Sequence, residues 1–136
     1  MTDKKLDCIM LVDDNPDDNF IHERAIRKTQ LHCVIATKTS AADALEHIKL
    51  QKQPQPDLIF LDINMPGTNG WDFLEEYGRL DENLQRRVVI VMLTTSENRD
   101  DQLRAKALSF VTDFIAKPLT KDIVNGIISK YFRDSI

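Results

Sequence analysis

The stretch Val88-Val89-Ile90-Val91-Met92-Leu93 is an unbroken apolar run that ends at the polar residue Thr94. A short apolar run without alternation is typical of a strand buried on both faces of a parallel sheet. Similar runs elsewhere predict further strands, so that the full set lies at about residues 6–12, 32–37, 57–61, 88–93 and 111–116. Amphipathic stretches alternate with these runs, which is the pattern of an α/β fold. We therefore predict a parallel sheet with helices covering both faces.

Five helices are expected between and after the strands. The residues that cap or open four of them are typical of helix starts or turns: Asn15 with Pro16, Ser40, Gly70 and Thr120. The remaining helix is expected to begin near residues 96–98 and to carry Leu103, Ala107 and Leu108 on its apolar side. The expected helices thus alternate with the strands along the chain, and we expect no second domain.

Composition narrows the class of protein. A chain of 136 residues, 42% of them hydrophobic and 29% charged, fits one globular domain. We expect this domain to span residues 1–136, with a core from about 7 to 132 and no output domain. No apolar run approaches the roughly 18 residues of a membrane span, and residues 1–5 are too polar for a signal peptide. We therefore expect a soluble, cytoplasmic protein that does not bind membranes.

Charge and cysteine content argue against nucleic-acid-binding, disulfide-rich and zinc-binding proteins. The formal net charge is −4 and there is no basic stripe, which argues against direct binding of nucleic acid. Cys8 and Cys33 form no CxxC pair, so neither a disulfide framework nor a zinc site is indicated. His22, His32 and His47 share no metal-ligand spacing and are expected at the surface or in helix packing.

Polar side chains follow four of the predicted strands. Asp13 and Asp14 follow the first strand, Asp62 the third, Thr94 the fourth and Lys117 the fifth. Any one of these residues alone would be an ordinary cap, turn or surface residue. In an open parallel sheet, however, the ligand site lies outside the carboxyl ends of the strands. We therefore expect the five side chains to form one cluster.

The chemistry of this cluster points to phosphoryl transfer. Each pair of ionised carboxylates about 4 Å apart would repel by roughly 4 kcal/mol at an effective dielectric near 20, so the site calls for a cation. An oxygen-only ligand set suits Mg²⁺, which also accepts phosphate oxygens. Phosphoryl transfer needs a nucleophile, a metal and groups that stabilise the phosphoryl oxygens. Asp62, Mg²⁺, Lys117 and Thr94 would supply these parts.

At these residues the chain resembles the receiver domain of two-component response regulators. The matching motifs are Leu11-Val12-Asp13-Asp14, residues 62–70, Leu93-Thr94-Thr95-Ser96 and Lys117-Pro118. The resemblance covers about residues 8–132 and is to the stand-alone, single-domain type, similar to the chemotaxis response regulator. It implies a flavodoxin-like, doubly wound sheet of five parallel strands in the order 2-1-3-4-5, with five helices.

The resemblance also implies a role for each site residue. Asp62 would accept a phosphoryl group from a sensor histidine kinase or a histidine phosphotransfer protein. The implied Mg²⁺ ligands are Asp14, Asp62 and the backbone carbonyl of Asn64, with Asp13 acting mainly through bound water. Thr94 would donate a hydrogen bond to the phosphoryl group and Lys117 would pair with it. Such a chain is no conventional enzyme and catalyses at most its own phosphorylation and dephosphorylation.

Signalling in this family suggests further expectations. The Lys117-Pro118 bond should be cis, and Phe114 should be the aromatic residue that responds when Thr94 shifts. The responding surface would comprise the helix expected to begin near residues 96–98, the strand at 111–116 and the helix after Thr120. A downstream protein partner would read it, although onward phosphotransfer to a histidine stays open. Asn64 and Ser96 are expected to tune the lifetime of the phosphoryl group.

Three alternatives remain. An aspartyl-phosphate hydrolase typically has a second acid two residues after its nucleophile, where this chain has Asn64. A flavodoxin-type cofactor binder would need a hydroxyl- or glycine-rich phosphate loop after the first strand, but the acidic segment 13–18 would repel a phosphate that lacks a metal. A phosphorylation-independent binding module on the same fold is the third alternative, and only chemistry distinguishes it.

Overall fold

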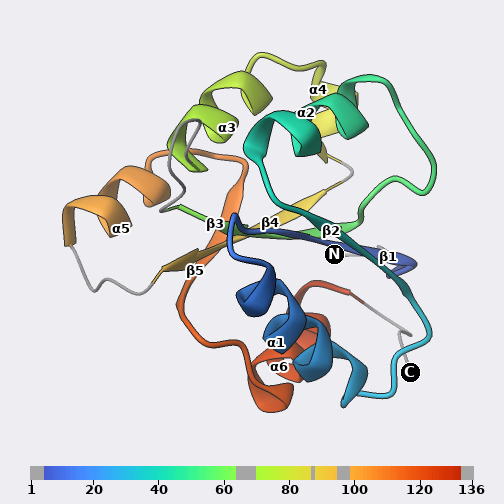
Figure 1. The fold of residues 1–136 in the computed structure, drawn as a ribbon. Coiled ribbons are helices and arrows are strands. Elements are labelled where there is room, and N and C mark those ends of the chain that lie inside the picture. Colours follow the sequence, from blue (N-terminus) through green and yellow to red (C-terminus); the bar gives the residue numbers. More distant parts are fainter. Residues whose placement is uncertain (1–4, 64–69, 87, 95–98, 133–136) are drawn as a thin grey trace.

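Five parallel strands form a single sheet in the computed structural model, which describes residues 5–63, 70–86, 88–94 and 99–132 (Figure 1). The strands are β1 (Cys8–Val12), β2 (Val34–Lys38), β3 (Leu58–Asp62), β4 (Val89–Thr94) and β5 (Val111–Ala116). Their order is β2-β1-β3-β4-β5, and each neighbouring pair is parallel. The flavodoxin-like order 2-1-3-4-5 is therefore confirmed, and every predicted strand is present within two residues of its expected bounds.

Helices cover both faces of this sheet (Figure 1). They are α1 (Pro16–Arg27), α2 (Ala41–Lys49), α3 (Gly70–Tyr77), α4 (Glu82–Arg86), α5 (Arg99–Lys106) and α6 (Lys121–Tyr131). The helices α1 and α6 lie on one face, and α2, α3 and α5 lie on the other. The five expected helices are α1, α2, α3, α5 and α6. Across the described residues, no helix is both long and apolar enough to cross a membrane.

The short helix α4 was not expected from the sequence. It is held by hydrogen bonds to the last residue of α3 and to the turn that follows. The Tyr77 hydroxyl donates to the Gln85 carbonyl (3.0 Å), and Gln85 Nε2 donates to the carbonyls of Gly78 (3.1 Å) and Leu80 (2.8 Å). These hydrogen bonds involve side chains across the turn, so α4 is stabilised by contacts that a periodic pattern of apolar residues does not reveal.

The central strands explain the unbroken apolar runs. Every residue of β1, β3 and β4 is buried, and neighbouring residues face opposite layers. In β3, Ile59 and Leu61 pack under α2 and α3, whereas Leu58 and Phe60 pack under α1 and α6. The edge strand β2 is only partly buried, and its Val34 is 51% exposed. The core is thus two apolar layers separated by the sheet.

Side-chain caps begin three of the helices as the sequence indicates. The side chains of Asn15, Ser40 and Thr120 each accept a hydrogen bond from a backbone N–H in the first turn of α1, α2 and α6. Pro16 is the first residue of α1. The predicted starts of these helices are therefore confirmed by their cap geometry.

The expectation for α5 is partly wrong. Leu103 is 63% exposed, whereas Ala105 is the buried residue among the side chains that the structure describes in this helix. Two residues correspond to about 200° around a helix, so Leu103 lies on the side opposite Ala105. Leu108 does pack against the core, but it follows the end of the helix. The expected start at residues 96–98 lies outside the described residues.

Candidate functional site

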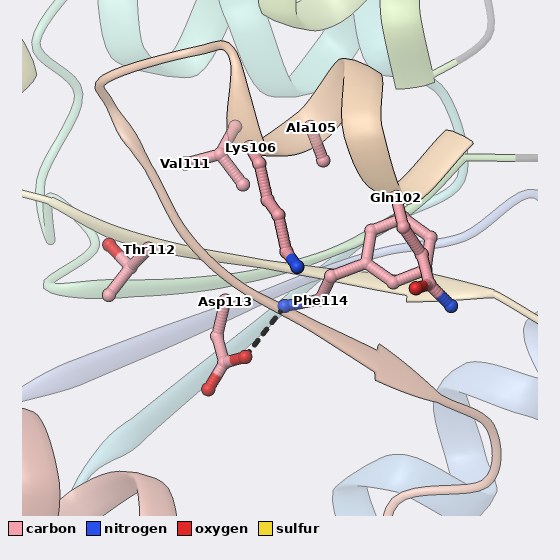
Figure 2. A pocket seen from close by; sticks show the side chains of 7 residues that line it. All are labelled: Gln102, Ala105, Lys106, Val111, Thr112, Asp113 and Phe114. Carbon is pink, nitrogen blue, oxygen red and sulfur yellow. Dashed lines mark hydrogen bonds between the residues drawn. The ribbon is translucent and has the colours of Figure 1, made fainter. Parts of the chain in front are cut away.

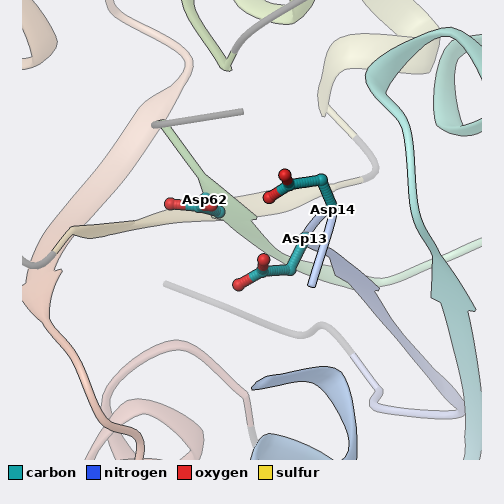
Figure 3. A group of neighbouring side chains, drawn as sticks. All are labelled: Asp13, Asp14 and Asp62. Atoms are coloured by element: carbon teal, nitrogen blue, oxygen red, sulfur yellow. The ribbon is translucent and has the colours of Figure 1, made fainter. Parts of the chain in front are cut away.

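Three carboxylates converge at the carboxyl ends of β1 and β3 (Figure 3). Asp13 and Asp14 directly follow β1, and Asp62 is the last residue of β3. One oxygen from each side chain lies within 4.8 Å of the others, a spacing at which one cation could contact all three. Asp13 and Asp62 are buried, whereas Asp14 is exposed, so the cluster has one side open to solvent.

Lys117 is the cation that the structure places against this cluster. Its Nζ lies 2.7 Å from Asp13 Oδ2, 3.0 Å from Asp18 Oδ2 and 3.6 Å from Asp62 Oδ1. The Lys117-Pro118 bond is cis, as expected, and the Lys117 backbone N–H donates to the Thr94 carbonyl at 2.7 Å. The end of β5 is therefore tied to the end of β4 at the point where the lysine turns inward.

The charge state of Lys117 follows from these contacts. Burial by itself would lower the pKa of Lys117, but hydrogen bonds to Asp13 and Asp18 and the charge of Asp62 raise the pKa above its ordinary value. Because its pKa is raised, Lys117 carries a positive charge, and it does so in a nearly buried position, since the side chain is only 10% exposed. The Lys117 ammonium contacts the carboxyl groups of Asp13, Asp18 and Asp62, and Asp14 belongs to the same cluster. One lysine beside four acidic side chains leaves room for a divalent cation.

Thr94 is positioned by the sheet. It is the last residue of β4, it is 1% exposed, and it pairs with Ala116 directly before Lys117. The neighbouring Leu93 carbonyl accepts from Ile63 N, directly after Asp62. The strand ends that carry Asp62, Thr94 and Lys117 are therefore adjacent. Asn64 and Ser96, for which ligand and tuning roles are expected, lie outside the described residues.

Phe114 borders a cavity between β5 and α5 (Figure 2). The cavity has a volume of about 290 Å³ and is lined by Gln102, Ala105, Lys106, Val111, Thr112, Asp113 and Phe114. Phe114 also packs against the core layer that contains Ala105. The aromatic residue expected to respond to Thr94 thus lies where a change in its position would reach the surface between α5 and β5.

Two residues of α1 belong to the site although they were not among the predicted site residues. Asp18 lies in the first turn of α1 and contacts Lys117. His22 lies one turn further along α1 and is 2% exposed. Burial lowers the pKa of His22, the charge of Lys117 lowers it further, and Asp13 and Asp18 act in the opposite direction. The i, i+4 spacing of Asp18 and His22 is the sequence signal that both face the sheet.

Asn19 joins α1 to the sheet beside these residues. Its Nδ2 donates to the backbone carbonyls of Asp13 (3.1 Å) and Lys38 (3.3 Å), at the ends of β1 and β2. The Asp13 side chain accepts from Asn15 N at 3.0 Å. The loop that carries Asp13 and Asp14 is therefore held through both the backbone carbonyl and the side chain of Asp13.

Such a site can perform a specific set of chemical steps. A buried carboxylate beside two others can act as a nucleophile once a cation neutralises its neighbours, and a nearby ammonium can stabilise charge that develops on a transferred group. The all-oxygen donor set fits a hard divalent cation.

Comparisons with known proteins agree with this geometry. The profile of the response regulator receiver domain matches residues 9–129. A two-component response regulator from Cytophaga hutchinsonii is 30% identical, with a TM-score of 0.83 over 94% of this chain and 98% of that one. The Mn²⁺-bound response regulator Rcp1 is 26% identical, with a TM-score of 0.78 over 96% of this chain and 97% of that one.

Curated relatives differ in length. Sporulation initiation phosphotransferase F of Bacillus subtilis (strain 168) is 30% identical over 91 residues, which are 67% of this chain and 69% of that protein. The chain spans only between 7% and 31% of the length of four other curated relatives. The family match nevertheless covers most of the chain, and it includes Asp13, Asp14, Asp62, Thr94 and Lys117. The chain therefore belongs to the receiver domain family of two-component response regulators.

Proposed function

We propose that this chain is a phosphoacceptor in two-component signalling and that Asp62 receives the phosphoryl group from a sensor histidine kinase or a histidine phosphotransfer protein. The observation that carries the proposal is the position of the Asp62 carboxylate: it is buried, it lies in the cluster with Asp13 and Asp14, and it is 3.6 Å from Lys117 Nζ. Asp62 is the acid of the cluster that both ends a strand and faces the lysine.

The proposed reaction transfers one phosphoryl group from nitrogen to oxygen. An Asp62 carboxylate oxygen forms a bond to phosphorus while the bond from phosphorus to the donor imidazole breaks. The imidazole nitrogen keeps the electron pair and takes up a proton. Lys117 donates to the phosphoryl oxygens, and the Thr94 hydroxyl donates from the neighbouring strand end. The chain thus assists its own modification without being a conventional enzyme.

We propose Mg²⁺ as the cation of this site. Asp13, Asp14 and Asp62 would hold it, with Asn64 contributing through its carbonyl. The bound ion would neutralise carboxylates and phosphoryl oxygens, which lowers the repulsion between the nucleophile and an anionic donor. Mn²⁺ in the related Rcp1 supports a divalent cation here.

The signal would leave through the surface formed by α5, β5 and α6. A phosphoryl group on Asp62 attracts Thr94 and Lys117, and Phe114 responds beside the cavity between β5 and α5. A downstream protein partner in the cytoplasm would bind the changed surface. Shifting a two-state equilibrium from 1:99 to 99:1 requires roughly 5.5 kcal/mol, a sum within reach of a few charge-assisted hydrogen bonds.

Intact-mass measurement after incubation with acetyl phosphate tests the proposal. A gain of one phosphoryl mass is expected with Mg²⁺, and no gain is expected in Asp62→Asn or without the metal. Asp17→Asn is the matched control, since Asp17 is an exposed aspartate outside the cluster. An unmodified natural chain that is folded and binds Mg²⁺, and that also stays unmodified with histidine kinases, would refute the proposal and favour a phosphorylation-independent binding module.

A further inference from the structure

Asp18 holds an unusual place among the acids that contact Lys117. The lysine Nζ has carboxylate oxygens at 2.7 Å (Asp13), 3.0 Å (Asp18) and 3.6 Å (Asp62). Asp13 and Asp62 belong to the cluster that could hold a cation, whereas Asp18 does not. Asp18 is therefore a lysine partner that a cation bound to the cluster would leave available.

The fold explains why Asp18 reaches the lysine. Pro16 opens α1, so Asp18 is the third residue of the helix and lies close to the end of β1. Its side chain is 34% exposed, compared with 3% for Asp13. The contact is thus an ion pair at the rim of the site, and solvent weakens it without preventing it.

We propose that Asp18 is a positioning residue that restrains Lys117 in the unphosphorylated state and so competes with the phosphoryl group for the ammonium. The proposal rests on the proposed function of Asp62. Lys117 must turn its hydrogens toward the incoming phosphoryl oxygens, and each hydrogen bond kept by Asp18 opposes that movement. Asp18 also shares the ammonium with Asp13 and Asp62, so part of the hydrogen bonding of Lys117 goes to an acid that lies outside the cation cluster.

Removing the Asp18 charge should therefore change two measurements in opposite directions. In Asp18→Asn, the phosphorylation rate at saturating Mg²⁺ should rise because Lys117 no longer has a charged hydrogen-bond partner outside the cation cluster. The affinity for Mg²⁺ should fall because the lysine then rests only on acids that the cation also needs. A part-exposed ion pair corresponds to a factor of about two to five in each measurement. General loosening of the site would instead lower both.

Asp17→Asn provides the matched control. Asp17 precedes Asp18 in the same first turn, is exposed and is about 100° away around the helix. The two substitutions remove the same charge and a similar interaction with the helix dipole. A difference between them therefore reports the contact with Lys117 and not the net charge of α1.

The experiment measures phosphorylation by acetyl phosphate with intact mass and Mg²⁺ affinity with NMR titration of the unphosphorylated protein. Both substitutions are also made in the Lys117→Gln background, where the extra effect of Asp18→Asn on Mg²⁺ affinity should vanish. The positioning role would be overturned if Asp18→Asn and Asp17→Asn had the same phosphorylation rate and the same Mg²⁺ affinity. It would also be overturned if their difference in Mg²⁺ affinity stayed the same in the Lys117→Gln background.

Failure of the proposed function gives a different result. In that case the natural chain itself gains no phosphoryl mass, while the Mg²⁺ titrations still decide whether Asp18 acts on Lys117. If the natural chain is phosphorylated and Asp18→Asn reacts no faster than Asp17→Asn, only the positioning role fails.

Discussion

Replacing Gly70 by alanine should destabilise the protein because α3 begins directly against the end of β3. A Cβ atom at Gly70 would lie 2.6 Å from Ile63 Cα and 2.7 Å from the Asp62 carbonyl oxygen. Unbonded carbon atoms prefer about 3.5–4.0 Å, so the helix or the strand end must move by roughly 1 Å. Neither contact is with a flexible side chain that could rotate away. Overpacking of this kind costs about 1–3 kcal/mol of unfolding free energy.

The chain offers a matched control in Gly126. This residue is exposed in α6, and a Cβ there would meet no atom within 4 Å. Gly126→Ala should therefore stabilise the protein by about 0.5–1 kcal/mol, the difference in helix propensity between the two residues. The same chemical change is thus expected to have opposite effects at the two positions.

Urea unfolding, followed by far-UV circular dichroism, measures both variants against the natural chain. With m values of about 1–3 kcal/mol/M, the two midpoints should be separated by roughly 1 M. Gly70→Ala should also lower Mg²⁺ affinity, since the displaced backbone includes Asp62. A Gly70→Ala midpoint equal to or above that of Gly126→Ala would refute the reasoning from the close approach.

Three further predictions concern the site and the helix beside it. His22 has a lowered pKa in the folded state, so its contribution to stability is complete above about pH 6.5 and is lost as the pH falls through the folded pKa. His22→Gln should flatten that loss in urea titrations between pH 7 and pH 5. Lys117→Met leaves Asp13 and Asp62 without their ammonium and should cost up to about 3–5 kcal/mol without metal. Mg²⁺ should then raise the melting temperature more than in the natural chain, and an equal rise would count against the charge argument. Arg104 lies 4.2 Å from the Trp71 ring centroid, so Arg104→Ala should destabilise α5 by about 0.5–1 kcal/mol more than Lys106→Ala, as measured by hydrogen exchange.

Local sequence patterns predicted the strands well because the strands of this fold are short apolar runs. The central strands are buried on both faces, and that burial requires unbroken apolar residues such as Val89 to Leu93. Caps were equally local, since the Asn15, Ser40 and Thr120 side chains bond only to the next residues of their own helices. The order of the strands came from the family resemblance and not from periodicity.

The candidate site was predictable to the extent that a strand end determines where a side chain lies. Asp13, Asp14, Asp62 and Lys117 all follow or end strands, and the sheet brings them together. Asp18 and His22 were missed as site residues because helix positions face the site only after the helix has docked. The misplaced apolar side of α5 has the same cause: Ala105 is small enough to approach the sheet, so Leu103 is left exposed.

The sequence by itself determined which segments become strands and which polar residues end them, because both depend on neighbours along the chain. Only the tertiary structure decided which carboxylates share Lys117 and which face of each helix is buried. These outcomes depend on residues far apart in sequence: 99 positions separate Asp18 from Lys117, although their charged groups lie 3.0 Å apart. A contact of that kind arises from the packing of α1 against the sheet: local spacing indicates which side chains share a helix face, but not which distant residue they contact.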